Sequence, residues 1–452
     1  MSLIIPANSA VSSVDQDNSL RFNVGSSDYL NRTQGTATSA KIFTLSMWVK
    51  ISTLGEAVFF SSYYNSTNRF QIYFNANGTL TILNKSSGST NINVQTNRVF
   101  RDISAWYNLI VAIDTTQGTD TNRVKLYVNG VQETSFSTAT YPSVNNNISI
   151  SGSNYILNLG RYGGTGSHFG GYMSEVVFVD GTAQANTDLG EFDEDSSIWK
   201  PIDVSGLTFG NNGFYLDYGD SSALGDDVSG NGNDFTVNNL TAIDQSTDTP
   251  TNNFATLNPL VNNFGDNMTL SEGNLVATSP DSSWNAAFST FGVTKGKWYW
   301  EAKLTNTSNN YYHGVAGSNI LVANAENPMN ENGFTGFYNA SGGEILKDGD
   351  VTANDYGTLS TNDILGVALN ADDYQITFYK NGSALVSNYA LSTTGRDTLF
   401  VLAVSAASGV SSYNFGSPAF AISSGNTDGN GYGNFEYAPP SGYYALCTKN
   451  LS

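Results

Sequence analysis

The sequence has few of the residues on which catalysis, covalent cross-linking and membrane insertion depend. It contains one cysteine, Cys447, and two histidines, His168 and His313, in 452 residues. A single cysteine cannot form an intrachain disulfide, so we expect the fold to be stabilised by hydrophobic cores and by assembly. No apolar stretch approaches transmembrane length, and the N-terminal residues lack the basic region of a signal peptide. We therefore expect a protein that is made in a cytoplasm and is not secreted by the usual route.

Basic residues are also scarce. The chain has 19 Lys and Arg against 39 Asp and Glu, which gives a formal net charge of −20. Between residues 201 and 294 there is no Lys or Arg, but there are eleven Asp and Glu. Such a surface repels phosphate backbones and anionic membranes, so we expect neither nucleic acid as a partner nor membrane insertion. Solubility is the favoured explanation of the acidity.

Helical periodicity is nearly absent, and the length of the chain suggests two or three domains. Only residues 187–199 could hold a short helix, which Gly190 weakens. Short runs rich in β-branched and aromatic residues, separated by turn residues, predict strands instead. In the first half these predicted strands cover residues 20–24, 44–51, 57–60, 70–74, 80–83, 106–114, 124–131, 157–161 and 171–180.

The block from about residue 20 to 200 resembles a laminin-G or concanavalin-A-like lectin jelly roll. Four motifs in the right order carry the resemblance: residues 43–49 (FTLSMWV), 106–109 (WYNL), 126–130 (LYVNG) and 169–176 (FGGYMSEV). A histidine usual in the second motif is replaced here by Tyr107. The resemblance implies an antiparallel β-sandwich.

A later block resembles the SPRY family, a β-sandwich binding module. The residues that carry the resemblance are 299–301 (YWE), 378–382 (FYKNG) and 400–416, which end in Asn-Phe-Gly. Asn381-Gly382 between apolar and aromatic residues is a strong hairpin signal, because both central residues of such a turn need positive φ. In this family the loops at one end of the sandwich bind the ligand, but no ligand-specific pattern is present here.

The sequence thus predicts an all-β protein with two tandem antiparallel β-sandwiches. We expect an N-terminal arm at residues 1–18, a laminin-G-like jelly roll at 19–205 and a SPRY-like sandwich at 260–420. An Asp/Asn/Gly-rich segment at 206–259 would connect the sandwiches, and residues 421–452 would form a Gly/Pro-rich tail.

No catalytic set is predicted. Neither histidine accompanies a Ser or Cys nucleophile motif. Glu191, Asp193 and Asp195 mimic the alternate carboxylates of jelly-roll glycosidases, but they follow the last predicted strand and lack apolar neighbours. We expect the chain not to be an enzyme, with a polysaccharide depolymerase as the alternative.

One segment combines many oxygen ligands with glycine. Within nine residues it contains Asp226, Asp227, Asn231, Asn233 and Asp234, which is a candidate calcium loop. The favoured interpretation is a plain turn, because Asp and Asn cap such turns with their own side chains. No other cofactor is predicted.

Three short clusters of aromatic and amide residues are candidate ligand contacts. The favoured alternative is that these residues pack in the core or cap its ends. These candidates are Tyr63, Tyr64, Asn65, Tyr311, Tyr312, His313, Tyr338 and Asn339, expected in exposed turns.

The two-sandwich layout and the Pro-Pro-x-Gly tail are similar to those of virion proteins of marine tailed bacteriophages. This resemblance implies a virion structural protein of the tail fibre, tail tip or capsid surface, acting as an adhesin for a host-surface glycan or receptor. A capsid decoration protein with no ligand is an alternative. We expect contacts with other virion proteins and a homo-oligomer, trimer first, because exposed sheet edges need cover.

Overall fold

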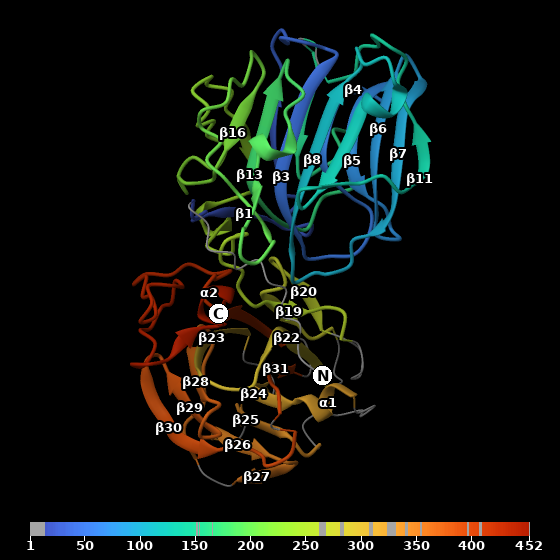
Figure 1. The fold of residues 1–452 in the computed structure, drawn as a ribbon. Coiled ribbons are helices and arrows are strands. Elements are labelled where there is room, and N and C mark those ends of the chain that lie inside the picture. The colour runs from blue at the N-terminus through green and yellow to red at the C-terminus, as the bar shows by residue number, and fades with distance from the viewer. Residues whose placement is uncertain are drawn as a thin grey trace. The chain divides into compact units, whose positions relative to one another are not determined.

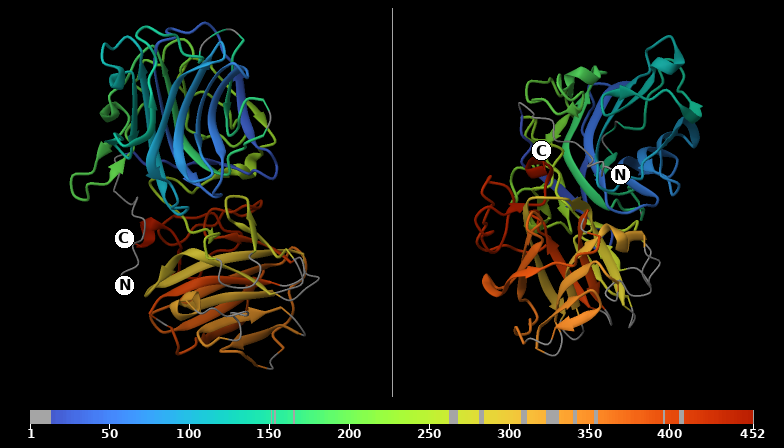
Figure 2. Two further views of the ribbon diagram at one scale, coloured as in Figure 1. Left: turned by 90° about the vertical axis from the view of Figure 1, so that its right-hand side faces the viewer. Right: turned by 60° about the horizontal axis from the view of Figure 1, so that its bottom comes forward.

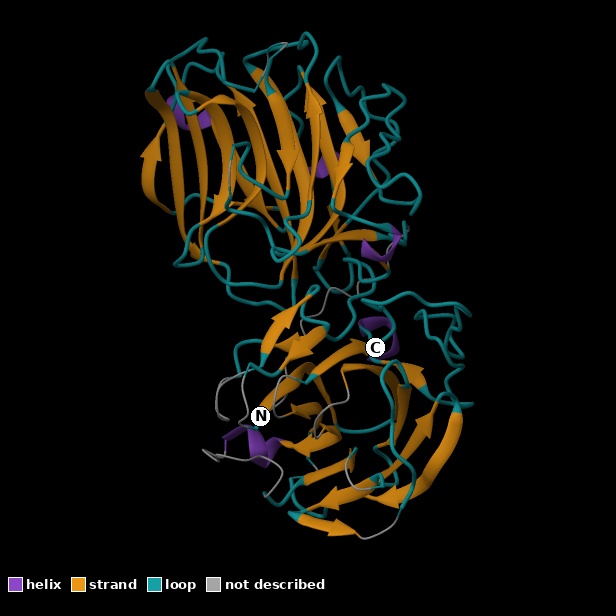
Figure 3. Cartoon of the chain, turned by 180° about the vertical axis from the view of Figure 1, so that it is seen from behind, coloured by secondary structure: helices purple, strands orange, loops and turns teal. Residues whose placement is uncertain are grey.

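The computed structural model describes residues 14–150, 152, 154–164, 166–261, 268–280, 284–306, 311–322, 331–339, 342–352, 355–395, 397–405 and 409–451. The chain divides into two compact units, and the boundary falls between Asn253 and Phe254. Strands dominate both units (Figures 1 and 3). No helix among these residues is long and apolar enough to cross a membrane. The predicted all-β fold with antiparallel sheets is confirmed.

The first unit is a sandwich of two sheets, which we call the β8 sheet and the β5 sheet (Figure 2). The β8 sheet has the order β10 (Val131–Gln132), β9 (Val124–Val128), β8 (Trp106–Asp114), β3 (Ile42–Ile51), β13 (Gly171–Asp180), β1 (Ser19–Phe22) and β18 (Gln245–Ser246), and β16 (Phe214–Leu216) also pairs with β13. The β5 sheet has the order β11 (Phe136–Thr140), β7 (Ser89–Val99), β6 (Thr79–Ser86), β5 (Asn68–Phe74), β4 (Ala57–Asn65), β12 (Ile156–Leu159), β2 (Tyr29–Thr33) and β17 (Thr236–Asn238).

The core of the first unit forms because apolar residues alternate along these strands. Phe70, Ile72 and Phe74 of β5 are buried and face the other sheet, where Phe43 of β3 meets Phe70 edge-on at 5.5 Å between ring centroids. A residue on such a strand that does not face the core must face outward. The outward-facing residues of β5 therefore lie on the outer surface of the β5 sheet.

The second unit is also a two-sheet sandwich. One sheet has the order β19 (Leu257–Asn258), β22 (Asn285–Val293), β31 (Leu399–Ser405), β24 (Tyr311–Gly317), β25 (Phe334–Tyr338), β26 (Glu344–Lys347) and β27 (Asp350–Thr352). The other has the order β20 (Thr269–Ser271), β21 (Val276–Thr278), β32 (Val410–Asn414), β23 (Lys297–Asn306), β28 (Ile364–Asn370), β29 (Gln375–Lys380) and β30 (Ser383–Ala390), and β33 (Tyr444–Ala445) pairs in parallel with β23. Two short helices, α1 (Ser318–Val322) and α2 (Thr448–Leu451), complete it.

Residues 206–259 were expected to connect the two sandwiches, but up to residue 253 they form part of the first unit. Its β16, β17 and β18 pair with β13, β2 and β1, so it belongs to both sheets of the first unit. Phe214 and Phe235 are buried in the core and meet edge-on at 4.8 Å between ring centroids. Long-range pairing rather than local apolar periodicity fixes these strands.

Both expected terminal segments also have packed parts. In the arm, residues 1–13 lie outside the described residues, but the backbone N–H of Gln16 donates to the hydroxyl of Thr251 at 3.1 Å. In the tail, Phe435 and Cys447 are fully buried, so this part of the chain completes the second unit.

The prediction of a short helix at residues 187–199 is wrong. The structure has a single 3₁₀ turn at Asn186–Asp188, followed by a hairpin of β14 (Glu191–Phe192) and β15 (Trp199–Lys200). A Cβ atom on Gly190 would lie 2.4 Å from the ring of Trp199, so the close approach of this buried indole requires glycine.

Candidate functional site: the outer face of the β5 sheet

The outer face of the β5 sheet carries a cleft of about 360 Å³. Because Phe70, Ile72 and Phe74 face the core, the alternate residues of β5 point outward into this cleft. Tyr162 and Ser167, from the loop between β12 and β13, also line the cleft. The lining side chains offer one carboxylate, one guanidinium, one amide, two phenols, one hydroxyl and two aliphatic groups: Glu56, Arg69, Gln71, Tyr73, Tyr162, Ser167, Val58 and Leu83.

Arg69 is the central cation of the cleft. Its Nε donates to Oε1 of Gln71 at 2.9 Å, and another of its N–H groups donates to the carbonyl of Ser66. The guanidinium lies 5.6 Å from the ring centroid of Tyr162, within cation–π range. Tyr63 meets Tyr162 edge-on at 5.2 Å between ring centroids. These contacts fix Arg69 and two aromatic rings beside one another.

The loop that follows β12 is held close to the sheet. The hydroxyl of Ser167 donates to Oε1 of Glu56 at 3.0 Å, and the N–H of Val58 donates to the carbonyl of Ser167 at 3.1 Å. A Cβ atom on Gly163 would lie 2.2 Å from Cβ of Tyr63, so only glycine allows this approach. The loop therefore positions Tyr162 and Ser167 over the outward side chains of the sheet.

A second arginine–tyrosine stack lies at the start of the same loop. The guanidinium of Arg161 lies 3.5 Å from the ring centroid of Tyr29, and its Nε donates to Oδ1 of Asn158 at 3.1 Å. Tyr29 and Asn158 each alternate with core leucines on their strands, so both face outward. His168 lies 6.2 Å from Tyr29, between ring centroids.

Tyr73 supplies a neutral phenol to the cleft. Burial raises the pKa of Tyr73, and a side-chain hydrogen bond with Thr81 lowers it in part. The phenol therefore keeps its proton at neutral pH and can donate a hydrogen bond. Together the cleft offers donors, acceptors and aromatic faces within one recess.

The structure brings one of the predicted ligand contacts to this cleft and separates the others from it. Tyr63 packs against Tyr162, as described above. Tyr64 points elsewhere, is 50% exposed and lies 5.6 Å from Tyr155, between ring centroids. Asn65 caps its own turn, because Oδ1 accepts hydrogen bonds from the backbone N–H groups of Thr67 and Asn68 at 3.0 and 2.9 Å.

Four of the five predicted contacts in the second unit, Tyr311, Tyr312, His313 and Tyr338, lie in strands, and Asn339 follows directly after β25. Tyr311, Tyr312 and His313 belong to β24 and are at most 6% exposed. Nδ1 of His313 lies 2.7 Å from the hydroxyl of Tyr413, and burial lowers the pKa of His313 to about 3. The imidazole is therefore neutral and belongs to the core. Aromatic pairs in the sequence do not distinguish a buried strand from a turn.

Two further predicted contacts have structural roles. The ring of Tyr338 stacks on Tyr312, with 4.2 Å between centroids and 4° between planes. The side-chain amide of Asn339 accepts from the N–H of Leu359 at 2.6 Å and donates to its carbonyl at 3.1 Å. Asn339 therefore fixes the chain near Leu359.

The candidate calcium loop uses its side chains to hold its own backbone. The carboxylate of Asp227 accepts from the N–H groups of Tyr215, Ser229 and Asn233 at 2.8–3.0 Å. Asp234 accepts from the N–H of Asp227 at 3.1 Å.

The amide groups of this loop and a neighbouring arginine complete the same arrangement. Asn231 and Asn233 donate to the carbonyl of Gly213 at 2.9 and 2.7 Å. Arg32 donates to Asn233, and the charges of Asp227 and Asp234 act on its guanidinium. Asp226 is exposed. Within the described ranges no cluster of three metal-ligating His, Cys, Asp or Glu side chains exists. The loop thus has the geometry of a side-chain-capped turn.

The acidic run near residue 191 forms a turn held by a lysine. Nζ of Lys200 lies 3.3 Å from both Glu191 and Asp193. Oδ1 of Asp193 accepts from the N–H groups of Asp195 and Ser196 at 3.2 and 2.9 Å. Hydrogen bonds from Ser196 lower the pKa of Asp193 to about 2. These carboxylates lie on a two-stranded hairpin outside both sheets of the sandwich.

Sequence reasoning missed most of the cleft. Gln71 and Tyr73 stand out only once Phe70, Ile72 and Phe74 are assigned to the core, because alternation then makes them outward-facing. Glu56, Tyr162 and Ser167 come from loops, and no local pattern brings them to β5. The useful signal was the pair of Arg69 and Gln71 within a strongly alternating strand.

Two known families match parts of this chain. A family model for the concanavalin A-like lectin/glucanases superfamily matches residues 8–187, and one for the SPRY domain matches residues 297–418. No curated protein matches the chain. The chain therefore contains a concanavalin A-like lectin domain followed by a SPRY domain.

Two solved structures resemble parts of the chain at low identity. The SPRY domain of human HERC1 is 15% identical, with 31% of this chain and 87% of that chain covered and a TM-score of 0.26. The native heptameric SAP-like pentraxin from Limulus polyphemus is 17% identical, with 39% of this chain and 82% of that chain covered and a TM-score of 0.29.

Proposed function

We propose that this protein is an adhesin whose concanavalin A-like domain binds a surface glycan in the cleft on the outer face of the β5 sheet. The observation that carries the proposal is the composition of that cleft, where Tyr73 and Tyr162 lie beside Glu56, Arg69 and Gln71. The presence of a lectin-superfamily domain in the same region supports it. We propose a binding role rather than a catalytic one.

The chemistry of the cleft suits a sugar. A pyranose ring presents C–H faces that pack on aromatic rings and hydroxyl groups that need donors and acceptors. Tyr162 is held in place by Tyr63 and Arg69, so little side-chain freedom is lost when a ring packs on it. Glu56 and Gln71 supply acceptors, while Arg69 and the neutral phenol of Tyr73 supply donors.

We further propose that the adhesin is part of a bacteriophage virion, where it contacts other virion proteins and assembles as a homo-oligomer, with a trimer as the first candidate. What supports this is the resemblance of the two-sandwich layout and tail to phage virion proteins. Mass spectrometry of purified particles tests the location, because absence of this chain would contradict it. Mass photometry of the purified chain tests the trimer.

The glycan-binding role is tested with the full chain on an array of bacterial surface polysaccharides. We expect binding by the wild type and a loss of up to about tenfold in Tyr162→Ala, since one aromatic stack contributes on the order of 0.5–1.5 kcal/mol. Tyr64→Ala is the matched control, because Tyr64 is exposed and lies outside the cleft lining. A folded wild type that binds no glycan would overturn the proposal.

A further inference from the structure

The β5 sheet is depleted of acidic residues in a strongly acidic protein. The chain has 39 Asp and Glu, yet the eight strands of this sheet contain none. The strands do contain four basic residues: Arg32, Arg69, Lys85 and Arg98. The strands of the β8 sheet in the same unit contain three acidic residues, Asp114, Glu175 and Asp180, and three basic ones, Arg21, Lys50 and Lys125. The two faces of this sandwich therefore differ in charge.

Two cations of the β5 sheet lie directly opposite each other. Arg69 of β5 pairs in register with Lys85 of β6, and directly opposed residues of an antiparallel pair point to the same side of the sheet. Tyr63 of β4 is the register partner of Arg69 on the other side, so a Tyr–Arg–Lys row crosses three strands. Like charges in opposed positions destabilise a sheet. This row is therefore unfavourable unless an anion neutralises it.

No carboxylate of the described chain forms an ion pair with Arg69. Its hydrogen bonds go to the side-chain amide of Gln71 and the carbonyl of Ser66, and its flat face meets Tyr162, so every partner is neutral. Arg161 likewise has the ring of Tyr29 and the amide of Asn158 as its partners. Both arginines are thus oriented by neutral groups with their charge uncompensated.

Some cations of the described chain are paired with carboxylates. Lys50 meets Asp248 at 2.6 Å and Lys380 meets Asp363 at 2.9 Å. On the β5 sheet itself, Arg98 of β7 meets Glu133 at 2.7 Å. In a chain with twice as many acidic as basic residues, such pairing needs no special arrangement. Arg123 also has only carbonyl groups as partners, so neutral partners alone do not mark a binding site. What distinguishes Arg69 is a second cation, Lys85, directly opposite it on a sheet whose strands contain no acidic residue, and this arrangement favours an external anion.

Glu56 is the one carboxylate among the described residues that line the cleft. It lies in the loop before β4 and accepts the hydroxyl of Ser167, so it belongs to the rim rather than to the sheet. Its charge opposes an anionic ligand. A variant of Glu56 therefore tests the charge of the ligand, because neutralising this carboxylate should strengthen the binding of an anion.

We propose that the outer face of the β5 sheet binds an anionic polysaccharide, with carboxylate or sulfate groups held by Arg69 and Lys85 and by Arg161 at the start of the loop that follows β12. This inference rests on the proposed glycan-binding function and names its ligand class. The net charge of −20 repels polyanions over most of the surface, so absence of acidic residues from one sheet gives such a ligand a place to bind. Guanidinium groups bind carboxylate and sulfate with two parallel hydrogen bonds.

The test uses polysaccharide pairs with one backbone and two charge states. Polygalacturonate and its methyl ester probe the carboxylate, while dextran sulfate and dextran probe the sulfate. We expect the full-length protein to bind at least one acidic member about tenfold or more tighter than its neutral partner, with affinity that falls as salt rises. Arg69→Gln, Lys85→Gln and Arg161→Gln should each lose about tenfold or more in affinity, the size of one charged hydrogen bond.

Two variants complete the design. Glu56→Gln should bind the acidic polysaccharide more tightly than the wild type. Lys125→Gln, on the β8 sheet, removes the same charge from the other sheet and should change nothing. Equal affinity for the acidic and neutral members would overturn the anionic ligand while the glycan-binding function stands. No binding to these or to any arrayed glycan by the folded protein would overturn both.

Discussion

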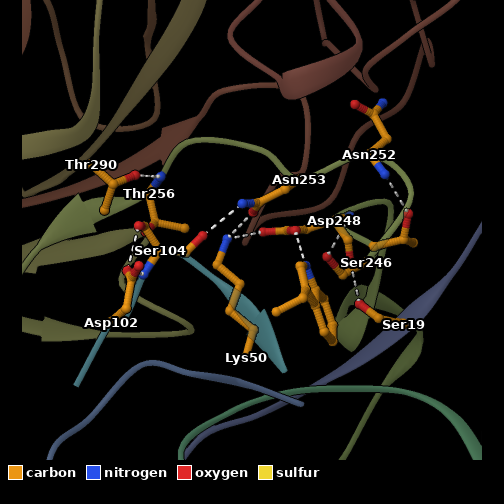
Figure 4. A network of polar contacts seen from close by, with 12 residues as sticks. Ser19, Lys50, Asp102, Ser104, Ser246, Asp248, Asn252, Asn253, Thr256 and Thr290 are labelled. Atoms are coloured by element: carbon orange, nitrogen blue, oxygen red, sulfur yellow. Dashed lines mark hydrogen bonds and ion pairs between the residues drawn. The ribbon is translucent and has the colours of Figure 1, made fainter. Parts of the chain in front are cut away.

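Nζ of Lys50 lies 2.6 Å from Oδ2 of Asp248, and both side chains are only 1% exposed (Figure 4). The same carboxylate accepts the indole N–H of Trp106 at 3.0 Å, and the same ammonium donates to Oδ1 of Asn253 at 2.7 Å. The hydroxyl of Ser19 donates to the backbone carbonyl of Asp248 at 2.6 Å. This buried network ties the last residues of the first unit to its first strands.

Removal of one member of this buried pair should be costly. Asp248→Asn leaves the Lys50 ammonium buried without its anion, so we expect the unfolding free energy of the first unit to fall by about 3–5 kcal/mol. Denaturant unfolding of the full chain measures it. Glu191→Gln breaks a pair whose carboxylate is half exposed and should cost less than about 1 kcal/mol. A loss below 1 kcal/mol for Asp248→Asn would show that the network is not structural.

Glu175 makes the stability of the first unit depend on pH. It lies at a β-bulge of β13 with φ of 50°, and the hydroxyl of Tyr215 donates to its carboxylate. The pKa of Glu175 is raised to about 7, chiefly by burial and also by the charges of Asp217 and Asp203, while the Tyr215 hydrogen bond lowers it in part. The folded state therefore holds this proton more tightly than the unfolded state does.

The sign of the resulting pH effect follows from linkage. Between the ordinary value of 4.5 and about 7 the unfolded chain loses this proton first, so stability falls as pH rises and the full loss is present above pH 7. We expect Glu175→Gln to stabilise the first unit by about 3 kcal/mol at pH 8 and to have little effect at pH 4.5. Thermal unfolding at both pH values measures it. Glu194→Gln, at an exposed site, is the control, and equal effects of Glu175→Gln at the two pH values would contradict the account.

Glu301 fixes the C-terminal segment to the second unit. Its buried carboxylate accepts the backbone N–H groups of Glu436 and Tyr437 at 3.0 and 2.8 Å, and the side-chain amide of Asn414 donates to it at 3.0 Å. Beyond this contact the chain continues to Cys447, which is fully buried. This carboxylate, together with the pairing of β33 with β23, holds a segment whose far end contains the one thiol of the protein.

This arrangement makes the thiol a reporter of the Glu301 contact. Glu301→Gln replaces one acceptor oxygen with an N–H donor that faces a backbone N–H, so the segment should open more often. We expect the rate of Cys447 modification by a thiol reagent to rise about tenfold or more, since an unmet buried donor costs on the order of 1–3 kcal/mol. Glu344→Gln in β26 is the control. An unchanged rate in Glu301→Gln would mean that other contacts hold the segment.

Local signals were enough to predict most strands and hairpins. The predicted strands at residues 106–114 and 171–180 coincide with β8 and β13. Asn129-Gly130 and Asn381-Gly382 have φ values of 48° and 74°, and of 48° and 78°, as their hairpin turns require. Each of these features depends on residues adjacent in sequence.

Features that depend on distant residues could not be predicted. β16 is three residues long and is recognised as a strand only by its pairing with β13. In the site, Tyr63 and Tyr162 are far apart in sequence but in contact in space, and Tyr311 and His313 look like loop residues until β24 is placed in the core. Whether such a residue lies in a site or in the core depends on burial and strand pairing, which are set by the tertiary structure.

The most direct test of the central claim is hydroxyl-radical footprinting of the full chain with and without the tightest-binding polysaccharide. Tyrosines react in proportion to their exposure, and the cleft contains Tyr73 and Tyr162 while Tyr64 and Tyr338 lie outside its lining. We predict that the polysaccharide protects Tyr73 and Tyr162 and leaves Tyr64 and Tyr338 unchanged. Protection confined to the second unit, with Tyr73 and Tyr162 unaffected, would contradict a glycan site on the outer face of the β5 sheet.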